Sequence, residues 1–313
     1  HVGKFVPDPL TGQRHLQYQP KPKLEKDLLE ILSRLNRIKP DFMAFQEIEN
    51  TGRSDSLKSF VQDRVSKEYV ACDVQGNDGR GIRVGQMSRG FNVQYESHRD
   101  LPWVDPYDPP MYPQRQKLFS RDLPAAILFI PGFEEPYAIV LIEHGKSQRT
   151  EITADKRSEI IRGVEQVGVA ALVKYYERRY PRVPVYVMGD FNAELIRREF
   201  IPVLQTGVGE VFETLPTRFV SRGDRLTQSY HPLNRKGYEL RAVHGQLDYI
   251  LANEVGKKYV LDSWVERPID ENGRAIPLAQ SYAQRALRGG SDHDARVMVF
   301  DNRRRLLDMG VGL

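Results

Sequence analysis

The alternation of apolar and polar positions along the chain predicts two long helices. Apolar residues recur at intervals of four and three positions over 24–38, which puts them on one helical face that Pro40 ends: Leu24, Leu28, Ile31, Leu35 and Ile38. A second stripe predicts a longer helix, which Pro181 ends: Ile160, Val164, Val167, Ala171 and Tyr175. Both helices are amphipathic, so each should cover the face of a sheet.

Short apolar runs between and after these helices predict buried strands. They are residues 42–45, 82–88, 125–130, 137–142, 185–188, 246–251 and 295–300. The segment 101–117 is rich in proline and aromatic residues and predicts a loop, and a long insertion over 266–290 predicts another. Strands interspersed with long helices, without a dividing linker, predict a single α/β domain with at least two sheet layers.

Polar residues follow several of these runs at the point where the strand ends. The stretch VYVMGDFNAE, for example, places Asp190 and Asn192 directly after a short apolar strand. Five polar clusters lie at or beside the ends of apolar strands: Gln46-Glu47, His144, Asp190 with Asn192, Asp248, and Ser291-Asp292-His293. Because α/β folds gather strand ends at one edge of a sheet, where their sites usually lie, we expect these clusters to meet.

Each cluster also has an ordinary structural explanation. Glu47 could cap a helix, His144 could be a surface histidine, and Asp248 could be a turn residue at the start of a strand. The residues 291–293 could belong to a loop, and Asp190 could simply occupy a turn. Their joint occurrence in this order favours a functional site over these explanations.

The residue types suit hydrolysis of a phosphate ester. A phosphodiester is anionic and repels hydroxide, so catalysis needs charge neutralisation, an activated water and a protonated leaving group. Glu47 offers a hard oxygen ligand for Mg²⁺, which takes only one or two carboxylates and keeps several waters. Asp190 would orient and deprotonate the attacking water.

The remaining polar residues suit the stabilisation of charge and the donation of a proton. Asn192 can donate an amide N–H to a phosphate oxygen without adding negative charge. His293 and His144 can each be cationic near neutral pH, so either can stabilise the developing charge or protonate the leaving oxygen. Asp248 would hold one of the two imidazoles in the right tautomer.

The motifs resemble those of the endonuclease/exonuclease/phosphatase superfamily, which has the deoxyribonuclease I-like fold. The similar segments are MAFQEIEN, LIEHGKSQ, VYVMGDFNAE, QLDYILAN and GGSDHDARVMV, and the match spans about residues 24–300. The resemblance implies a four-layer sandwich of two packed mixed β-sheets flanked by helices, and a hydrolase that uses Mg²⁺, Mn²⁺ or Ca²⁺. It also implies that His293 is the partner of Asp248, and that Asp292 lies on the metal side with Glu47.

One element of the family pattern is missing. The first strand of the family normally carries an asparagine that helps to bind the metal, and no such strand precedes Leu24. Residues 1–23 are polar and irregular and begin at His1. We therefore expect residues 1–313 to form one domain that lacks its natural N-terminal strand, although true loss of the element is the alternative.

Composition and charge narrow the function only slightly. The content of 40% hydrophobic and 28% charged residues fits a soluble globular protein, and no apolar run approaches the roughly 18–20 residues of a membrane span. The single Cys72 excludes an internal disulfide framework and a cysteine-based metal cage. The net charge of +4 permits a nucleic acid partner.

A divalent-metal-dependent nuclease is the leading hypothesis, because residues 144–147 also resemble the nuclease-like members of the family. The first alternative is a phosphatase or phosphodiesterase that acts on a small or lipid-linked phosphate, of the inositol phosphate or sphingomyelin type. The second alternative is a catalytically silent binding module. We expect a monomer, either cytoplasmic or secreted.

Overall fold

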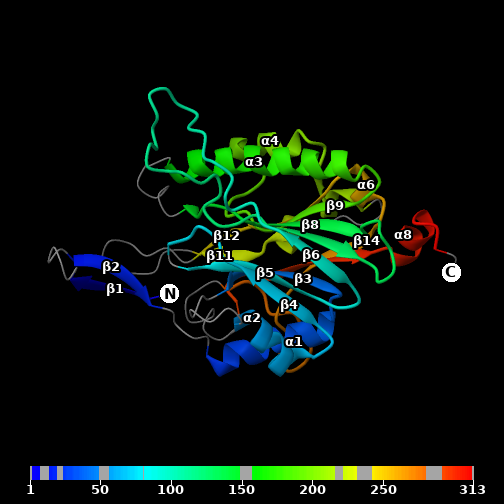
Figure 1. Ribbon diagram of the computed structural model, residues 1–313. Helices are drawn as coiled ribbons and strands as arrows, with labels where there is room; N and C mark the ends of the chain where they lie inside the picture. The colour runs from blue at the N-terminus through cyan, green and yellow to red at the C-terminus, as the bar shows by residue number, and fades with distance from the viewer. Residues whose placement is uncertain are drawn as a thin grey trace.

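Two sheet layers pack against each other between two layers of helices in the computed structural model (Figure 1). The structure describes residues 2–7, 14–19, 24–48, 56–79, 81–148, 157–215, 221–230, 242–279 and 291–311. The long helix α3 covers one face of a six-stranded sheet, a second layer of strands packs on the other face, and α1 and α2 lie outside that layer. This order confirms the predicted four-layer α/β sandwich. Within the described ranges, no helix has the length and apolarity needed to cross a membrane.

The six-stranded sheet forms the centre of the molecule. Its order is β10 (Gly209–Glu210), β13 (Asp248–Ala252), β9 (Val185–Asp190), β8 (Ala138–His144), β7 (Ala125–Phe129) and β6 (Asn92–Glu96). Strands β8 and β9 run parallel and the other neighbours run antiparallel, so the sheet is mixed. All seven residues of β8 are buried because both faces of the sheet are covered, which explains the continuous apolar run in its sequence.

Helix α3 (Arg157–Arg179) covers this sheet, together with the short helices η3 (Arg198–Phe200) and α4 (Ile201–Leu204). The predicted stripe of α3 is wrong, since Val167, Ala171 and Tyr175 are exposed. The buried face instead carries the apolar residues Ile161, Val169, Leu172, Val173 and Tyr176, and the polar residues Arg162, Glu165 and Gln166. These buried polar side chains find hydrogen-bond partners in the fold, so a count of apolar positions alone selected the wrong face.

The second strand layer consists of two antiparallel pieces among the described residues. One has the order β3 (Phe42–Ile48), β5 (Arg83–Ser88) and β4 (Val70–Val74), and the other pairs β14 (Val260–Glu266) with β15 (Ala295–Phe300). Helices α1 (Glu25–Ile38) and α2 (Ser56–Phe60), the latter continued by the π-helix η1 (Val61–Val65), cover the outer side (Figure 1). The apolar residues between the two layers include Val140, Tyr186 and Ile250 from the first sheet.

Shorter elements complete the chain. Strand β1 (Val2–Pro7) pairs with β2 (Arg14–Gln19), so the prediction of an irregular segment over 1–23 is wrong for these residues. Strand β11 (Gln228–Tyr230) pairs with β12 (Val243–Gly245). The short helices are η4 (Val211–Thr214), α5 (Arg222–Arg225), α6 (Glu254–Lys257) and α8 (Asn302–Asp308). The predicted loop 101–117 contains no regular helix or strand, and a bridge between Pro102 and Lys117 closes its base. Of the predicted insertion 266–290, residues 280–290 lie outside the described part of the chain.

Candidate functional site

Three of the predicted site residues end up side by side because of strand register. Asp190 ends β9, and its direct neighbours across the sheet are His144 on the parallel strand β8 and Asp248 on the antiparallel strand β13. The preceding residue is Gly189, with a φ of +141°. A Cβ atom there would lie 2.0 Å from the carbonyl oxygen of Glu143, so only glycine lets β8 approach this closely. The polar ends of the three strands therefore form one row.

The carboxylate of Asp190 is buried at the centre of this row. Its Oδ1 accepts a hydrogen bond from the backbone N–H of Asn192 at 2.7 Å, and its Oδ2 accepts one from the Asn192 side-chain amide at 3.0 Å. His144 Nε2 lies 3.9 Å from the same Oδ2. Asn192 has a φ of +56°, in the left-handed region that asparagine tolerates better than most residues. This backbone turn brings its amide back onto Asp190.

Burial raises the pKa of Asp190 to about 7. The charge of His293 opposes this shift, while the negative charges of Asp248 and Glu47 add to it, and the hydrogen bond from the Asn192 backbone also opposes it. A carboxyl group with a pKa near neutrality can accept a proton readily at physiological pH, as a general base must.

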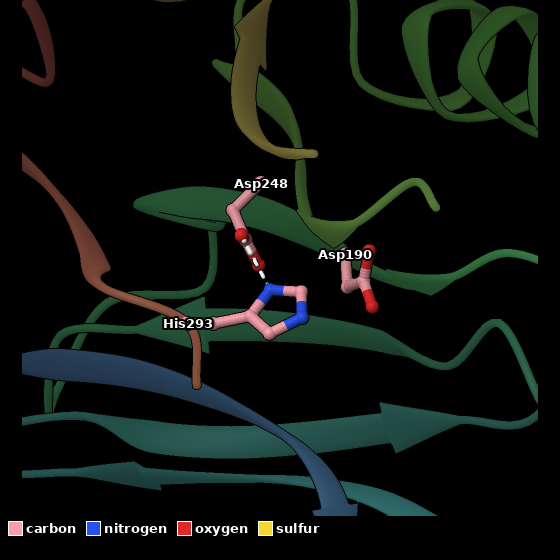
Figure 2. Close-up of side chains that lie close together, drawn as sticks. All are labelled: Asp190, Asp248 and His293. Carbon is pink, nitrogen blue, oxygen red and sulfur yellow. Dashed lines mark hydrogen bonds and ion pairs between the residues drawn. The ribbon is translucent and has the colours of Figure 1, made fainter. Parts of the chain in front are cut away.

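The second strand layer contributes His293, just before β15. Its Nδ1 lies 2.7 Å from Asp248 Oδ2, and the imidazole ring sits between Asp248 and Asp190 (Figure 2). Burial alone would lower the pKa of His293, but the carboxylates of Asp248, Asp190 and Asp292 outweigh it and raise the pKa well above its usual value. His293 is therefore protonated near neutral pH, and its Nδ1–H donates to Asp248.

Strand β11 and the residue before it hold these two side chains in place. Thr227 is fully buried, and its Oγ1 accepts hydrogen bonds from the backbone N–H groups of Leu247 and Asp248 at 3.0 and 3.2 Å. The Thr227 carbonyl accepts from the N–H of Asp294 at 2.8 Å, and the Gln228 side chain lies 2.9 Å from His293 Nε2. The sequence analysis missed Thr227 and Gln228, which follow no apolar run long enough to indicate a strand end.

A buried ion pair fixes the segment that carries His293. The next residue, Asp294, is buried, and its two oxygens accept from Arg34 Nη1 at 3.0 Å and Arg267 Nη1 at 2.8 Å. Arg34 belongs to α1, so this contact joins the outer helix to the site. No local pattern indicated this role for Arg34, because a charged residue in an amphipathic helix normally faces water.

Glu143 forms a second buried acid behind the row. It precedes His144 on β8, and its Oε1 accepts a hydrogen bond from Gln166 Nε2 at 3.1 Å. Burial raises its pKa to about 8, and the nearby charges of Glu165 and Asp190 add to the shift. Glu143 is therefore neutral at pH 7, which limits the negative charge crowded around Asp190.

Two groups of residues could hold a cation. Glu47 lies near the end of β3, between the paired residues Phe45 and Ile48, and has a φ of +57°. Asp292 precedes His293. Both are exposed carboxylates, and their charges raise the pKa values of Asp190 and His293 respectively. A second group consists of Asp190, Asp248 and His293, whose ligand atoms lie within 4.8 Å of one another. Metal-binding histidines must be neutral, so a protonated His293 fits the second group poorly. Exposed hard oxygens fit Mg²⁺ well.

The loop 101–117 is anchored beside this site. Arg115 Nη2 lies 3.2 Å from Glu165 Oε1, and Glu165 Oε2 accepts from the backbone N–H of Lys146, two residues after His144. The loop projects beyond the end of the molecule where α3 begins (Figure 1). Trp103 packs edge-on against Tyr112, and Arg115 stacks on Trp103. These two aromatic residues serve local packing, whereas Tyr107 is exposed.

Comparisons with known proteins identify the fold. The sequence matches no family model and no curated protein. Among solved structures, TDP2 of Caenorhabditis elegans is similar with a TM-score of 0.55 and 15% identity, over 88% of this chain and 69% of that one. A mannosyl-6-phosphatase of Bacteroides thetaiotaomicron is similar with a TM-score of 0.55 and 14% identity, over 88% and 90% of the two chains.

Danio rerio TDP2 in complex with a single-strand DNA product is also similar, with a TM-score of 0.53 and 16% identity, over 88% of this chain and 91% of that one. A protein of Bacteroides thetaiotaomicron described as an endonuclease/exonuclease/phosphatase family protein matches with a TM-score of 0.53 and 15% identity, over 87% of each chain. At these identities the likeness concerns the fold, and it agrees with the deoxyribonuclease I-like architecture that the motifs predicted.

Proposed function

We propose that this protein is a divalent-metal-dependent phosphoesterase, and most specifically a nuclease that hydrolyses phosphodiester bonds by in-line attack of water. The observation that carries the proposal is the arrangement of Asp190 and His293. A buried carboxylate with a pKa near 7 faces a protonated imidazole that a second carboxylate, Asp248, holds at 2.7 Å. Such a pair of groups with opposite protonation states suits the base and the acid of one hydrolysis.

In this mechanism Asp190 accepts the proton of the attacking water. His293 stabilises the charge that develops on the phosphate and supplies a proton to the leaving oxygen, while Asp248 keeps its ring in place. His144 is buried behind Asp190 at 3.9 Å, a position from which it supports the carboxylate. The Asn192 amide would leave Asp190 to donate to a non-bridging phosphate oxygen when substrate binds.

The proposed metal ligands are Glu47 and Asp292. The donor set fits a hard divalent cation, because both are exposed carboxylates, and hard oxygen ligands are those that Mg²⁺ prefers. When bound, Mg²⁺ would supply neutralisation of the phosphate charge and of the developing negative charge on oxygen. The proton transfers are assigned to Asp190 and His293.

Two features favour nucleic acid as the substrate. Arg198 is exposed eight positions after Asp190, and Arg222, also exposed, lies 3.7 Å from Glu194 on the same segment. Both arginines belong to, or contact, the segment that follows Asp190, which supports the proposal that a phosphate backbone contacts them. The fold likeness to a TDP2 structure that contains a single-strand DNA product agrees with this choice. The likeness to a mannosyl-6-phosphatase keeps a small phosphate ester as the second candidate.

An activity panel tests the proposal and separates the two substrate classes. The protein would be incubated with Mg²⁺, Mn²⁺ or Ca²⁺ and offered plasmid DNA, RNA, an abasic duplex, inositol phosphates and sphingomyelin. Binding to DNA should weaken steeply with salt, and Arg198→Ala or Arg222→Ala should each lower the slope of log K against log salt by about 1. Hydrolysis of the small phosphates alone would support the second candidate, and binding without turnover of any substrate would support a silent binding module.

A double-mutant cycle tests the proposed roles. Asp248→Asn and His293→Ala should each lower turnover by a few orders of magnitude, and the double variant should be little worse than the poorer single one, because an orienting carboxylate acts only through its histidine. Glu254→Gln, an exposed acid on α6, is the control and should leave turnover unchanged. Losses that multiply in the double variant would contradict the pairing and would pass the acid role to His144.

A further inference from the structure

A half-buried lysine stands beside the candidate site without a partner for its charge. Lys146 lies two residues after His144, just beyond the end of β8. Within the part of the chain that the structure describes, its ammonium group forms no hydrogen bond and no ion pair. A charge that is partly withdrawn from water is normally paired, because desolvation of an unpaired charge is costly. Lys146 therefore presents a positive charge that the neighbouring side chains leave uncompensated.

The backbone of Lys146 is fixed from both sides. Its N–H donates to Glu165 Oε2 at 3.0 Å, and its carbonyl accepts from Arg162 Nη1 at 2.7 Å. Both partners are buried residues of α3, and Arg162 is itself paired with Glu199. Because helix α3 holds the peptide groups on both sides of its Cα, this lysine stays at its place and only its side chain can turn.

Two guanidinium groups lie next to this lysine. Arg121 Nη1 donates to the Gly145 carbonyl at 2.8 Å, and its Nε lies 3.2 Å from Asp78 Oδ2. Arg115 Nη2 lies 3.2 Å from Glu165 Oε1, while the other oxygen of Glu165 accepts from the backbone of the lysine. Both arginines therefore have partners of their own, whereas the ammonium group beside them has none among the described residues.

The surroundings of Lys146 hold an excess of positive charge. Burial lowers the pKa of Lys146, and the charges of Arg121 and Arg115 also lower it. The carboxylates of Glu165 and Asp78 oppose this shift without reversing it. Glu165 already accepts from two backbone N–H groups as well as from Arg115. An anion next to the ammonium group would relieve the repulsion and supply the missing partner.

A shared acceptor joins these cations to the residues that would receive the scissile phosphate. The Gly145 carbonyl accepts from Arg121 Nη1 at 2.8 Å and from Asn192 Nδ2 at 3.0 Å. The Gly145 N–H donates to the Asp190 carbonyl at 2.9 Å, and the Asn192 amide also donates to the Asp190 carboxylate. Lys146 follows Gly145 directly, so its charge stands next to the Asp190–Asn192 turn.

We propose that Lys146 forms a subsite for a second phosphate group of the substrate, adjacent to the position where Asp190 and Asn192 would receive the scissile phosphate. An ammonium group suits this task, because it is a compact charge with three donors. The two nearby arginines are engaged with protein partners, so they contribute positive potential and not contacts.

The inference rests on the proposed phosphoesterase function and narrows its substrate class. Lys146 and His144 are two residues apart, so their Cα atoms are separated by at most roughly 7 Å. Successive phosphates of a nucleic acid strand are separated by one sugar, which is a similar length. The subsite therefore favours two phosphates joined through one sugar, as in single-stranded nucleic acid. A sugar monophosphate or sphingomyelin would leave the subsite empty.

Calorimetric titration with thymidine nucleotides tests the subsite without any catalytic step. Thymidine 3′,5′-bisphosphate carries two phosphates, whereas the 3′- and 5′-monophosphates carry one each. The original protein should bind the bisphosphate about 10–100-fold more tightly than either monophosphate, the range expected for one charged hydrogen bond. Lys146→Met should remove most of this gain, and Lys146→Arg should retain most of it because the charge is kept. The matched control is Lys58→Met, at an exposed lysine of the outer helix α2, which should leave the gain unchanged.

Chromogenic substrates test the same subsite during turnover. Thymidine 5′-(4-nitrophenyl phosphate) would be compared with the same compound that also carries a 3′-phosphate, and the isomers with exchanged positions would be compared likewise. In one of the two polarities, the second phosphate should raise kcat/KM about 10–100-fold. Lys146→Met should abolish this advantage by raising KM at unchanged kcat, because the contact binds substrate and transition state alike. Hydrolysis of the substrates with one phosphate should not change.

The outcomes separate the subsite from the proposed function. Absence of a bisphosphate gain in the original protein, or an equal loss of affinity for all three nucleotides in Lys146→Met, would overturn the subsite. A gain that Lys58→Met also removes would overturn it too, since the attraction would then be a general effect of net charge. A gain that depends on Lys146 without hydrolysis of any chromogenic substrate would support the subsite and contradict the phosphoesterase. Hydrolysis that Lys146→Met leaves unaltered for every substrate would do the reverse.

Discussion

Replacement of Glu143 by glutamine should make the protein more stable at alkaline pH. Glu143 is buried, and burial together with the charges of Glu165 and Asp190 raises its pKa from 4.5 to about 8. The folded state therefore binds a proton that the unfolded chain has released, in the window between these two values. Since stability rises with pH only where the unfolded state binds more protons, it must fall here as pH rises from about 4.5 to about 8.

The size of the effect follows from the separation of the two pKa values. Each pKa unit of separation corresponds to about 1.36 kcal/mol. Ionisation of Glu143 therefore lowers the unfolding free energy by up to about 5 kcal/mol above pH 8, and by less than about 1 kcal/mol at pH 5. Glutamine has almost the same shape, and its side-chain oxygen can still accept the hydrogen bond from Gln166. The Glu143→Gln variant buries no charge at alkaline pH and keeps the hydrogen bond with Gln166.

Urea unfolding followed by circular dichroism and tryptophan fluorescence would measure the difference at pH 5, 7 and 8.5. We expect Glu143→Gln to exceed the original protein by about 3–5 kcal/mol at pH 8.5 and to match it within about 1 kcal/mol at pH 5. The control is Glu254→Gln, an exposed acid whose pKa Lys257 lowers, and it should show no alkaline gain. A difference that does not vary with pH, or a loss of stability at pH 8.5, would refute the argument and would mean that Glu143 is buried as a stabilised anion.

Three other changes test single features of the site. Gly189→Ala should lower the unfolding free energy by more than about 3 kcal/mol, because the new Cβ would lie 2.0 Å from the Glu143 carbonyl oxygen at a φ of +141°. The control Gly132→Ala has a φ of +87° and open space around it, so it should lower the unfolding free energy by about 1 kcal/mol in the same thermal unfolding assay. Arg34→Met should lower the unfolding free energy by about 1–3 kcal/mol and slow turnover, because Asp294 loses one of its two arginine partners and keeps Arg267. The control Arg64→Met removes an exposed ion pair with Glu25 and should lower the unfolding free energy by less than about 1 kcal/mol. Equal losses of unfolding free energy in the two variants would show that Arg34 does not support the segment that carries His293. Glu47→Gln should weaken Mn²⁺ binding measured by calorimetry, while Asn192→Ala should lower turnover about 10²–10³-fold with Mn²⁺ affinity retained; unchanged affinity in Glu47→Gln would exclude it as a ligand.

The local signals of the sequence predicted much of the first sheet and of its polar edge. An apolar run with a polar residue at one end marks a strand and one of its ends together. His144 and Asp190 end their strands and Asp248 begins β13, so all three could be placed at strand ends before their register was known. The pairing of Asp248 with His293 came from the family resemblance, and the two side chains do lie within 2.7 Å. The catalytic, substrate-binding and metal roles of these residues remain predictions.

Other features depend on contacts that no local pattern records. The buried face of α3 carries Arg162, Glu165 and Gln166, and their partners lie 23 to 50 residues away in sequence. Thr227 supports Asp248 from 21 residues upstream, and Arg34 reaches Asp294 across 260 residues. A polar residue becomes acceptable in a core only when such a partner exists, so the hydrophobic pattern alone could not identify these positions. Strands β4, β6 and β14 were missed because few of their residues are buried, so polar residues interrupt the apolar runs in their sequences.

The division of the site between two sheets has a consequence for biosynthesis. Asp190 and Asp248 belong to the central sheet, but His293 comes 45 residues after Asp248 and arrives with the other layer. A ribosome-bound chain that has displayed only the central sheet would hold Asp190 and Asp248 without His293. The complete row of Asp190, Asp248 and His293 would thus form only when the final strands dock on the central sheet.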